Sequence, residues 1–250
     1  MEWYDEFFDE HYLDYWAQIL PPERTDREIA FIVEKLALRP GAAILDLCCG
    51  QGRHAIELAR LGYRITGLDL TPFLLEAGER AAQAAGVDVR FVQGDMRRIP
   101  FEGEFDAVIN LFTAFGYFDR DEEDEQVLAS VEGCLKPGGM FLVDQSHLFR
   151  AVREFQPRAR REYDDGTVLL EERAFDARTS RFTTHATYVK PDGSRAKRRN
   201  QIRCYTCAEL TGMLGRAGLD VVQVFGDFDG SELLMESRRL ILIARKPASG

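Results

Sequence analysis

Short apolar runs alternate with helical patterns through the middle of the chain. The runs at 44–47, 64–68, 89–92 and 105–111 have the length of strands, and the segments between them have the spacing of helices. We expect helices at 53–61, from 72 to about 86 and from about 122 to 135, with a fifth strand at 140–143. Strands and helices that alternate in this way form a parallel sheet with helices on both faces, so the pattern predicts an α/β fold.

The segment before the first strand is expected to be helical. Aromatic side chains recur along its first part at every fourth residue, at Tyr4, Phe8, Tyr12 and Trp16. Pro21 and Pro22 break that helix, and Thr25 or Asp26 can cap a second one that runs to about residue 38. We interpret the segment as a helical lid over a site, although an aromatic stripe also suits plain packing.

The alternation of strands and helices ends after the fifth strand. Three strands are expected as an antiparallel meander at 168–175, 182–189 and 198–205, which we interpret as a flap over the carboxyl edge of the main sheet. A helix at 207–217 and a strand pair at 221–225 and 240–244 return the chain to the core. The expected division is therefore a lid at 1–39, a core at 40–147 and 206–250, and a flap insertion at 148–205.

The charge balance argues against a bulk nucleic-acid binder, because such proteins are usually basic. The chain has 250 residues and a net charge of -10. Its acidic N-terminus lacks the basic start of a signal peptide, and no apolar run approaches a membrane span, so a cytoplasmic protein is expected. The five cysteines are expected as free thiols. Cys204 and Cys207 have zinc-like spacing but no second pair of ligands, so no metal is expected.

A glycine loop directly follows the first apolar run, in the sequence Asp46-Leu-Cys-Cys-Gly50-Gln-Gly52. Glycines let the backbone come close to a ligand, because no Cβ blocks the approach. Loops that hold pyrophosphate use N–H groups and a helix N-terminus, where a carboxylate such as Asp46 would repel the anion. The acid instead suits an ammonium, a sulfonium or ribose hydroxyls. The loop therefore favours S-adenosylmethionine over NAD.

Polar residues also close the next three strands. Asp69 follows the second strand, Asp95 follows the third and Asn110 closes the fourth. Ligands of doubly wound sheets bind outside the carboxyl ends of the strands, so these side chains are expected to share one edge with Asp46.

These motifs, taken together, resemble the class I S-adenosylmethionine-dependent methyltransferases. The resemblance covers most of 40–145 and the closing strand pair. It implies a doubly wound Rossmann-like sheet with a terminal antiparallel pair, S-adenosyl-L-methionine as cofactor and S-adenosyl-L-homocysteine as product. The stretches 110–117, 204–206 and 225–230 resemble, more loosely, small-molecule methyltransferases with a β-flap after the fifth strand.

The resemblance implies a role for each matching position. Asp46 and the loop residues Cys48, Cys49, Gly50 and Gly52 would face the methionine moiety and the ribose. Asp69 would accept from both ribose hydroxyls. The adenine would lie against Leu70, with Asp95 on its amino group and the Met96 N–H on a ring nitrogen, and the methyl-transfer edge would be lined by Asn110 and Leu111. Residues 136–139 match the turn before the fifth strand. Cys48 departs from the family, which commonly has glycine there, and this limits the backbone angles.

Methyl transfer from an activated donor mainly requires that the acceptor is held in line. The candidates for positioning the acceptor are Tyr12, Tyr117, Asp144, Gln145 and His147. We expect catalytic roles for His147, as a proton shuttle, for Tyr117, and for Tyr12, whose ring face suits a cationic amine. The acceptor atom stays open between nitrogen, oxygen, carbon and sulfur.

Three other functions are weighed beside a small-molecule methyltransferase. An NAD-dependent oxidoreductase is suggested by residues 50–55, which fit G-x-G-x-x-A, with Asp69 near the expected distance. An RNA-directed methyltransferase rests only on the flap arginines, at 158, 160, 161 and 195–199, and nucleic acid is not favoured as a partner. A module that binds the donor without catalysis is the third. An exposed flap edge also allows a homodimer.

Overall fold

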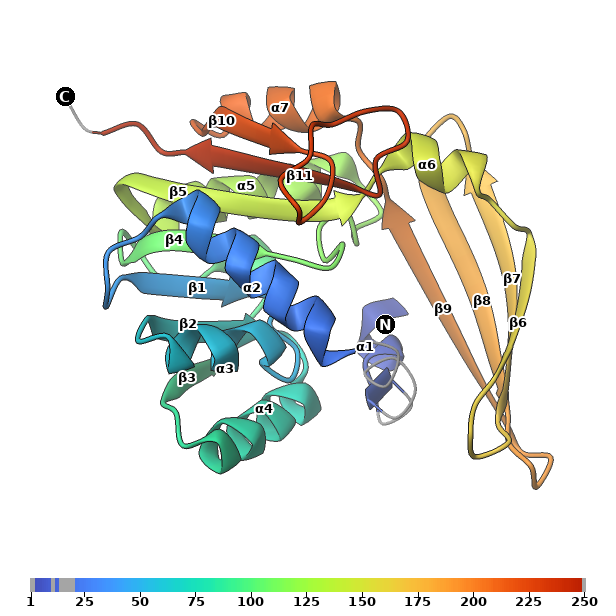
Figure 1. Ribbon diagram of the computed structural model, residues 1–250. Coiled ribbons are helices and arrows are strands. Elements are labelled where there is room, and N and C mark those ends of the chain that lie inside the picture. The colour runs from blue at the N-terminus through green and yellow to red at the C-terminus, as the bar shows by residue number, and fades with distance from the viewer. Residues whose placement is uncertain (1–2, 10–11, 14–20, 249–250) are drawn as a thin grey trace.

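The computed structural model describes residues 3–9, 12–13 and 21–248, and these ranges contain two sheets (Figure 1). The larger sheet has seven strands in the order β10-β11-β5-β4-β1-β2-β3. Neighbours among β1 to β5 pair in parallel, whereas β11 pairs antiparallel with β5 and β10. The bounds are β1 (Ala43–Leu47), β2 (Arg64–Asp69), β3 (Val89–Gln93), β4 (Phe105–Asn110), β5 (Leu135–Ser146), β10 (Asp220–Phe225) and β11 (Arg239–Arg245). The doubly wound sheet with a terminal antiparallel pair is confirmed.

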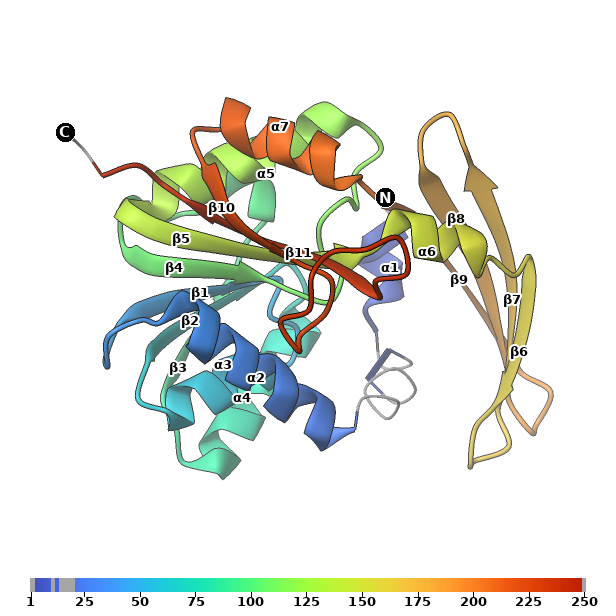
Figure 2. The same ribbon diagram turned by 45° about the horizontal axis from the view of Figure 1, so that its top comes forward.

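Helices cover both faces of this sheet (Figures 1 and 2). α2 (Pro22–Leu36) and α3 (Arg53–Arg60) pack on one face, and α5 (Asp121–Cys134) and α7 (Cys207–Arg216) pack on the other. The remaining helical segments of the described chain are α1 (Trp3–Phe7), α4 (Pro72–Ala85), a 3-10 helix (Met96–Arg98) and α6 (Leu148–Arg153). None of the helices in the described ranges has the length and apolar character of a membrane span.

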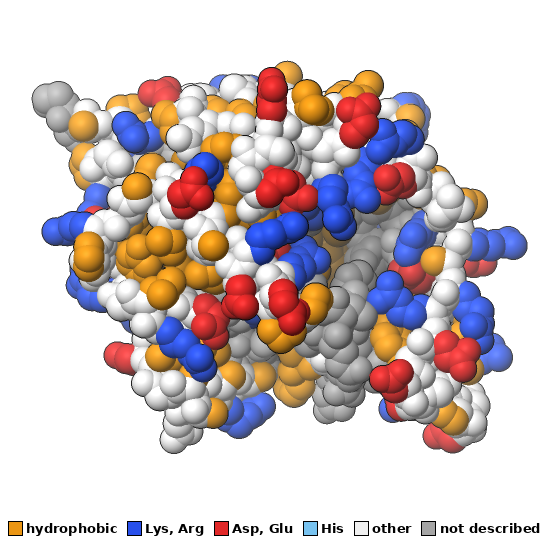
Figure 3. Space-filling model, viewed as in Figure 1, with side chains coloured by type: hydrophobic (Ala, Val, Ile, Leu, Met, Phe, Trp, Pro, Cys, Tyr) orange, Lys and Arg blue, Asp and Glu red, His pale blue; other side chains and the backbone are white. Residues whose placement is uncertain are grey.

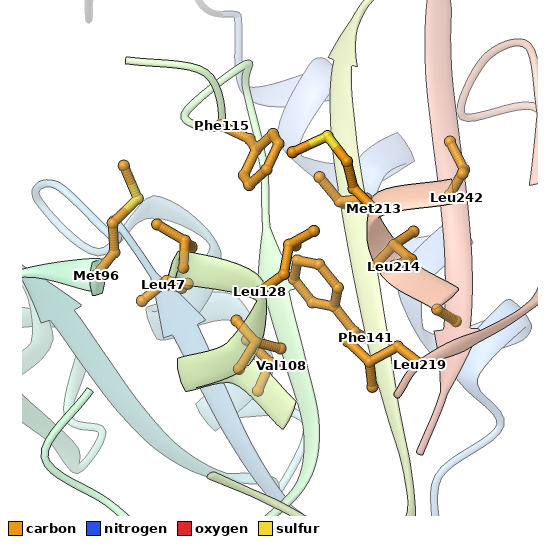
Figure 4. Close-up of a cluster of buried hydrophobic side chains, with 14 of the residues drawn as sticks. Leu47, Met96, Val108, Phe115, Leu128, Phe141, Met213, Leu214, Leu219 and Leu242 are labelled. Carbon is orange, nitrogen blue, oxygen red and sulfur yellow. The ribbon is translucent and has the colours of Figure 1, made fainter. Parts of the chain in front are cut away.

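Side chains of the central strands alternate between two apolar layers, as the period of two in a strand requires. In β1, Ile44 packs in the layer with α2 and α3, whereas Leu45 and Leu47 pack in the layer with α5 and α7. Figure 4 shows the second layer, whose labelled members include Val108, Leu128, Phe141 and Leu214. Because both faces of the strands are covered, their sequences are continuous apolar runs.

The flap is a separate antiparallel sheet of four strands beside the carboxyl edge of the core (Figures 1 and 2). Its strands are β6 (Arg158–Glu162), β7 (Val168–Asp176), β8 (Arg181–Val189) and β9 (Arg195–Arg203). The expected meander is confirmed, but the sequence missed β6 and the short helix α6. The sequence of β6, Arg-Ala-Arg-Arg-Glu, has no apolar alternation because most of it is exposed, and its pairing with β7 makes it a strand.

Three expected boundaries were wrong. Residues 136–139 do not form a separate turn before β5. They lie within it as an irregularity, since the pairing with β4 jumps from Leu135 to Met140. Helix α2 begins at Pro22 rather than after Thr25, because a proline is tolerated in the first turn, where its missing N–H is not needed. The long aromatic helix is wrong in its first part, where α1 has only five residues, and Trp16 lies outside the described residues.

Helix α3 begins directly after Gly52, whose φ of +79° lies in the left-handed region. A Cβ built on Gly52 would lie 2.8 Å from the ring of Phe91 on β3. Glycine is therefore required here both for the backbone angle and for the close approach of the ring.

A buried polar pair joins α5 to the segment between β9 and α7. The Tyr205 hydroxyl donates to Asp124 Oδ2 at 2.7 Å, and both side chains lie in the core. Burial raises the pKa of Asp124 to about 7. The carboxyl group is thus protonated in the folded protein over a pH range where an unfolded chain would ionise it.

We predict that Gly52→Ala lowers the free energy of unfolding by about 2 kcal/mol or more, because it adds a strained angle and an overpacked contact. Gly133→Ala on α5 is the matched control. A Cβ there meets nothing within 4 Å, so the added helix propensity should leave stability unchanged or raise it by up to about 1 kcal/mol. Urea unfolding measures the free energy of unfolding of both variants. Equal midpoints for Gly52→Ala and the parent protein would show that the turn tolerates a side chain.

Asp124→Asn should remove a pH-dependent loss of stability. The folded pKa of Asp124, about 7, exceeds the unfolded value of about 3.9. The unfolded state therefore releases its proton first, and the contribution of Asp124 is lost as pH rises from about 4 to about 7. The stability of the variant, which is neutral at every pH, should therefore rise relative to that of the parent by about 1–3 kcal/mol as the pH of urea unfolding is raised from 5 to 8. The same change at exposed Asp88 is the control, and a difference for Asp124→Asn that does not vary with pH contradicts the assignment.

Candidate functional site

A cavity lies at the carboxyl edge of the parallel strands, where ligands of doubly wound sheets bind. Its walls come from the ends of β1, β2 and β3, the loop after β4, and the N-terminal segment. It brings together most of the residues that the sequence predicted: Tyr12, Asp46, Cys48, Cys49, Gly50, Asp69, Leu70, Asp95, Met96, Leu111 and Tyr117. Parallel strands place their carboxyl ends on one side, and for this reason residues far apart in sequence meet here.

Asp46 is the most deeply buried acid of this cavity, with 2% of its surface exposed. Its Oδ2 atom finds no hydrogen-bond partner among the described residues. Burial raises the pKa of Asp46, although the nearby positive charges of His54 and Arg53 oppose this. A buried oxygen without a donor costs free energy, and a ligand that brings a donor would recover it.

Asp69 holds the glycine loop in place from the end of β2. Its Oδ2 accepts from the Gly50 N–H at 2.8 Å, and its Oδ1 accepts from the Thr71 N–H at 2.9 Å. Burial raises the pKa of Asp69, while these backbone hydrogen bonds oppose the rise. A carboxylate has about four acceptor sites, so each oxygen can still accept from a ligand that enters the cavity.

Cys48 has a φ of +62°, which is the left-handed conformation that favours glycine. Its Sγ lies 3.4 Å from Met96 Sδ, and burial raises the pKa of the thiol well above its usual value. Cys48 is therefore a neutral wall of the cavity rather than a nucleophile. Gly52 does not line the cavity, and its role is to start α3 against Phe91.

Asp95 caps the 3-10 helix and is paired with a cation. It accepts from the Arg97 backbone N–H at 2.8 Å and from the Arg97 guanidinium, which also binds Glu123. Although partial burial acts to raise the pKa of Asp95, the hydrogen bonds from Arg97 lower it overall. Asp95 is thus an ionised acceptor at the same rim as Asp46 and Asp69.

Besides Gly52, four predicted residues do not line the cavity, and their roles in the site stay predictions. Asn110 is fully buried and donates to the Leu47 backbone oxygen at 3.1 Å, so it joins β4 to β1. Asp144 forms a buried ion pair with Arg239. Gln145 exchanges hydrogen bonds with the backbone of Tyr205. The polar groups of these three side chains are thus bound to neighbouring strands and to the segment before α7.

His147 is the fourth predicted residue that does not line the main cavity. Its Nδ1 lies 3.1 Å from the Ser237 backbone oxygen, and the residue lines a second cavity that shares no residue with the first. Burial lowers the pKa of His147. A proton shuttle must reach the reacting atoms. His147 lines the second cavity rather than the one where the acids gather, so its catalytic role stays a prediction that this geometry does not support.

Aromatic rings close the opposite wall of the main cavity. Tyr4, Phe8 and Tyr12 from the N-terminal segment meet Tyr117 and Phe118 there. The segment is anchored by Trp3 Nε1, which donates to the Tyr117 backbone oxygen at 3.0 Å, and by an ion pair between Asp9 and Arg198 of the flap. Burial raises the pKa of Tyr12 to about 12 and that of Tyr117 well above its usual value. Both phenols therefore stay protonated at neutral pH and cannot serve as strong bases.

Two residues that the sequence did not assign to the site also line the main cavity. Arg53 and His54 follow the glycine loop directly, and both contact the buried carboxylate of Glu28. Glu28 Oε2 lies 2.6 Å from Arg53 Nη1 and 2.8 Å from His54 Nε2. Although its burial opposes this, these partners hold the pKa of Glu28 well below its usual range. Because Arg53 and His54 lie in the first turn of α3, directly after the glycine loop, the sequence could have assigned them to the site. No local pattern in the sequence assigns Glu28 to it.

The comparisons with known proteins agree with this geometry. A family model described as a methyltransferase domain matches residues 44–139. The Bacillus subtilis protein named "Putative methyltransferase YqeM" is 27% identical over 81% of this chain and 83% of its own length. The structure of an S-adenosylmethionine-dependent methyltransferase from Clostridium acetobutylicum superposes with a TM-score of 0.82 at 17% identity, covering 98% of this chain and 99% of that one.

A third relative was solved with S-adenosylmethionine bound. This is CalS10, an amino pentose methyltransferase from Micromonospora echinaspora, with a TM-score of 0.69 at 21% identity, covering 96% of this chain and 98% of that one. The oxidoreductase alternative receives no support from any of these matches. The motifs, the sheet with its antiparallel pair and the domain matched over residues 44–139 together support a class I S-adenosylmethionine-dependent methyltransferase.

Proposed function

We propose that this methyltransferase transfers the methyl group of S-adenosylmethionine to an amine nitrogen of a small molecule. The observation that carries the proposal is the cavity in which Asp46, Asp69 and Asp95 line one rim and aromatic rings form the facing wall. Three carboxylates and an unpartnered buried oxygen fit a ligand that is cationic and rich in donors.

Each acid is suited to a different part of the donor. The free Oδ2 of Asp46 can accept from the ammonium of the methionine moiety, beside the Gly50 loop. Asp69, already fixed by two backbone N–H groups, can accept from both ribose hydroxyls. Asp95 can accept from the adenine amino group, with the Met96 N–H on the ring and Leu70 against its face.

S-adenosylmethionine supplies an already activated methyl group on a sulfonium. The chain must therefore orient the acceptor and exclude water, which the aromatic wall and the anchored N-terminal segment favour. The neutral phenols of Tyr12 and Tyr117 can position an amine through their hydroxyls or ring faces. An amine can lose its proton before or after transfer, so the reaction needs no strong base in this cavity.

The names of relatives support an amine as the acceptor. CalS10 is an amino pentose methyltransferase, and two proteins that match 60% and 57% of this chain are glycine/sarcosine N-methyltransferases.

Three expectations from the sequence stay predictions. The N-terminal segment is proposed as a lid because it walls the main cavity and contacts the flap through Asp9 and Arg198. A cytoplasmic location stays a prediction. A homodimer through the flap is proposed from the exposed edge of β6.

Asp69→Ala should weaken S-adenosylmethionine binding by about 10-fold or more, because it removes a charged acceptor and releases the Gly50 loop. Calorimetric titration of the purified protein measures this, and Asp88→Ala at an exposed position is the control that should bind as the parent does. A parent protein that gives neither heat nor thermal stabilisation with S-adenosylmethionine or S-adenosylhomocysteine would contradict the proposed function.

A further inference from the structure

A second cavity lies on the same edge of the sheet as the main one, past the end of β5. It is bounded by the first turns of α2, by the start of α6 and by the segment between β10 and β11. Figure 3 shows Lys and Arg side chains gathered on this face between the core and the flap. The guanidinium groups that line the cavity belong to Arg24, Arg27, Arg150, Arg238 and Arg239.

The cavity is cationic although the chain as a whole is acidic. Its five arginines are paired with four carboxylates, those of Glu28, Glu154 and Asp227 in its lining and that of Asp144 beneath Arg239, and Glu28 is shared with Arg53 of the main cavity. Asp227 is shared by Arg27 at 3.0 Å and Arg238 at 3.9 Å. Each guanidinium carries five N–H donors, so pairing with a shared carboxylate leaves donors for a further anion.

The guanidinium groups also remain accessible. The side chains of Arg27 and Arg238 are 51% and 68% exposed, and that of Arg150 is 28% exposed beside Glu154. Arg239 is held at the base of the cavity by its ion pair with Asp144. A rigid base with accessible arginines around it is suited to an oxyanion that enters from solvent.

One aromatic ring and one carboxylate separate this cavity from the main one. Phe112 lines the main cavity, and the guanidinium of Arg24 lies 4.8 Å from the centre of its ring. Glu28 binds Arg24 through Oε1 and contacts Arg53 and His54 of the main cavity through Oε2. Residues that line the two cavities are therefore in direct contact, which places the cavities beside each other.

We propose that the second cavity binds a carboxylate or phosphate group of the methyl acceptor. The acceptor then carries an amine for the main cavity and an oxyanion for the arginines. This inference rests on the proposed function and narrows its substrate class to anionic amines. Carboxylate and phosphate share the geometry that a guanidinium recognises, with two oxygens that accept two parallel N–H bonds.

The first test uses inorganic phosphate and acetate as separate probes, titrated by calorimetry into protein saturated with S-adenosylhomocysteine at fixed ionic strength. At least one of the two probes should bind, and the probe with the higher affinity indicates whether the cavity prefers a phosphate or a carboxylate. Arg27→Gln and Arg150→Gln should each weaken that binding by about 10-fold or more, as expected for a lost charged hydrogen bond. Arg178→Gln, at a 91% exposed position on the flap turn, is the control that should bind as the parent does.

All three variants should retain the parent affinity for S-adenosylhomocysteine within about twofold and the parent melting temperature. This readout shows that the fold and the donor site are intact. Absence of phosphate and acetate binding, or binding that survives both cavity substitutions, overturns the inference. Failure of the parent to bind S-adenosylhomocysteine would instead contradict the proposed function.

The second test measures S-adenosylhomocysteine formation with matched small amines that carry, or lack, a carboxylate or phosphate. Turnover should require the anionic group. With such an acceptor, Arg150→Gln should raise KM by about 10-fold or more and leave kcat within about twofold, because the contact is remote from the reacting atoms. A neutral amine that is methylated as well as its anionic counterpart overturns this inference and leaves methyl transfer itself supported.

Discussion

The site depends on one costly arrangement, the burial of the Asp46 carboxylate with one oxygen unpaired at the end of β1. Taking a carboxylate out of water is unfavourable unless donors replace the lost hydration. The described residues supply only part of them, since Oδ2 has no partner. The central position of β1 between β2 and β4 fixes the carboxylate in place, and the surrounding apolar layers prevent it from turning outward. A cationic ligand relieves this cost directly.

The rest of the main cavity supports that arrangement. Asp69 fastens the Gly50 loop through a backbone hydrogen bond, which sets the approach to Asp46. Arg53 brings positive charge to the same side, but its ion pair with Glu28 neutralises much of it. The aromatic wall excludes water from the facing side. Glu28 also contacts Arg24, so the same carboxylate that balances the main cavity helps to shape the arginine cavity beside it.

The sequence predicted the sheet and the acids well because both depend on local rules. Apolar runs of strand length, glycine turns and helix-length spacing repeat along 42–145, and parallel strands necessarily place Asp46, Asp69 and Asp95 on one edge. The left-handed angle at Cys48 also agrees with the departure noted in the sequence. These inferences needed only strand order and direction.

The remaining features depend on contacts between distant segments. His147 follows β5 as an edge residue should, yet it contacts Ser237 and lies in the second cavity, which no local pattern indicates. Glu28 meets Arg53 only through the packing of α2 on α3. β6 has the sequence of an exposed loop and becomes a strand by pairing with β7. Where a side chain's role is set by a partner far along the chain, the sequence alone did not assign it.

A crystal structure of the complex with S-adenosylhomocysteine tests the central claim most directly. The account predicts the amino nitrogen of the homocysteine moiety within hydrogen-bonding distance of Asp46 Oδ2, at roughly 2.7–3.2 Å. It also predicts both ribose hydroxyls on Asp69. An adenosyl group seated away from this rim, or an Asp46 carboxylate that stays without a donor in the complex, would contradict it.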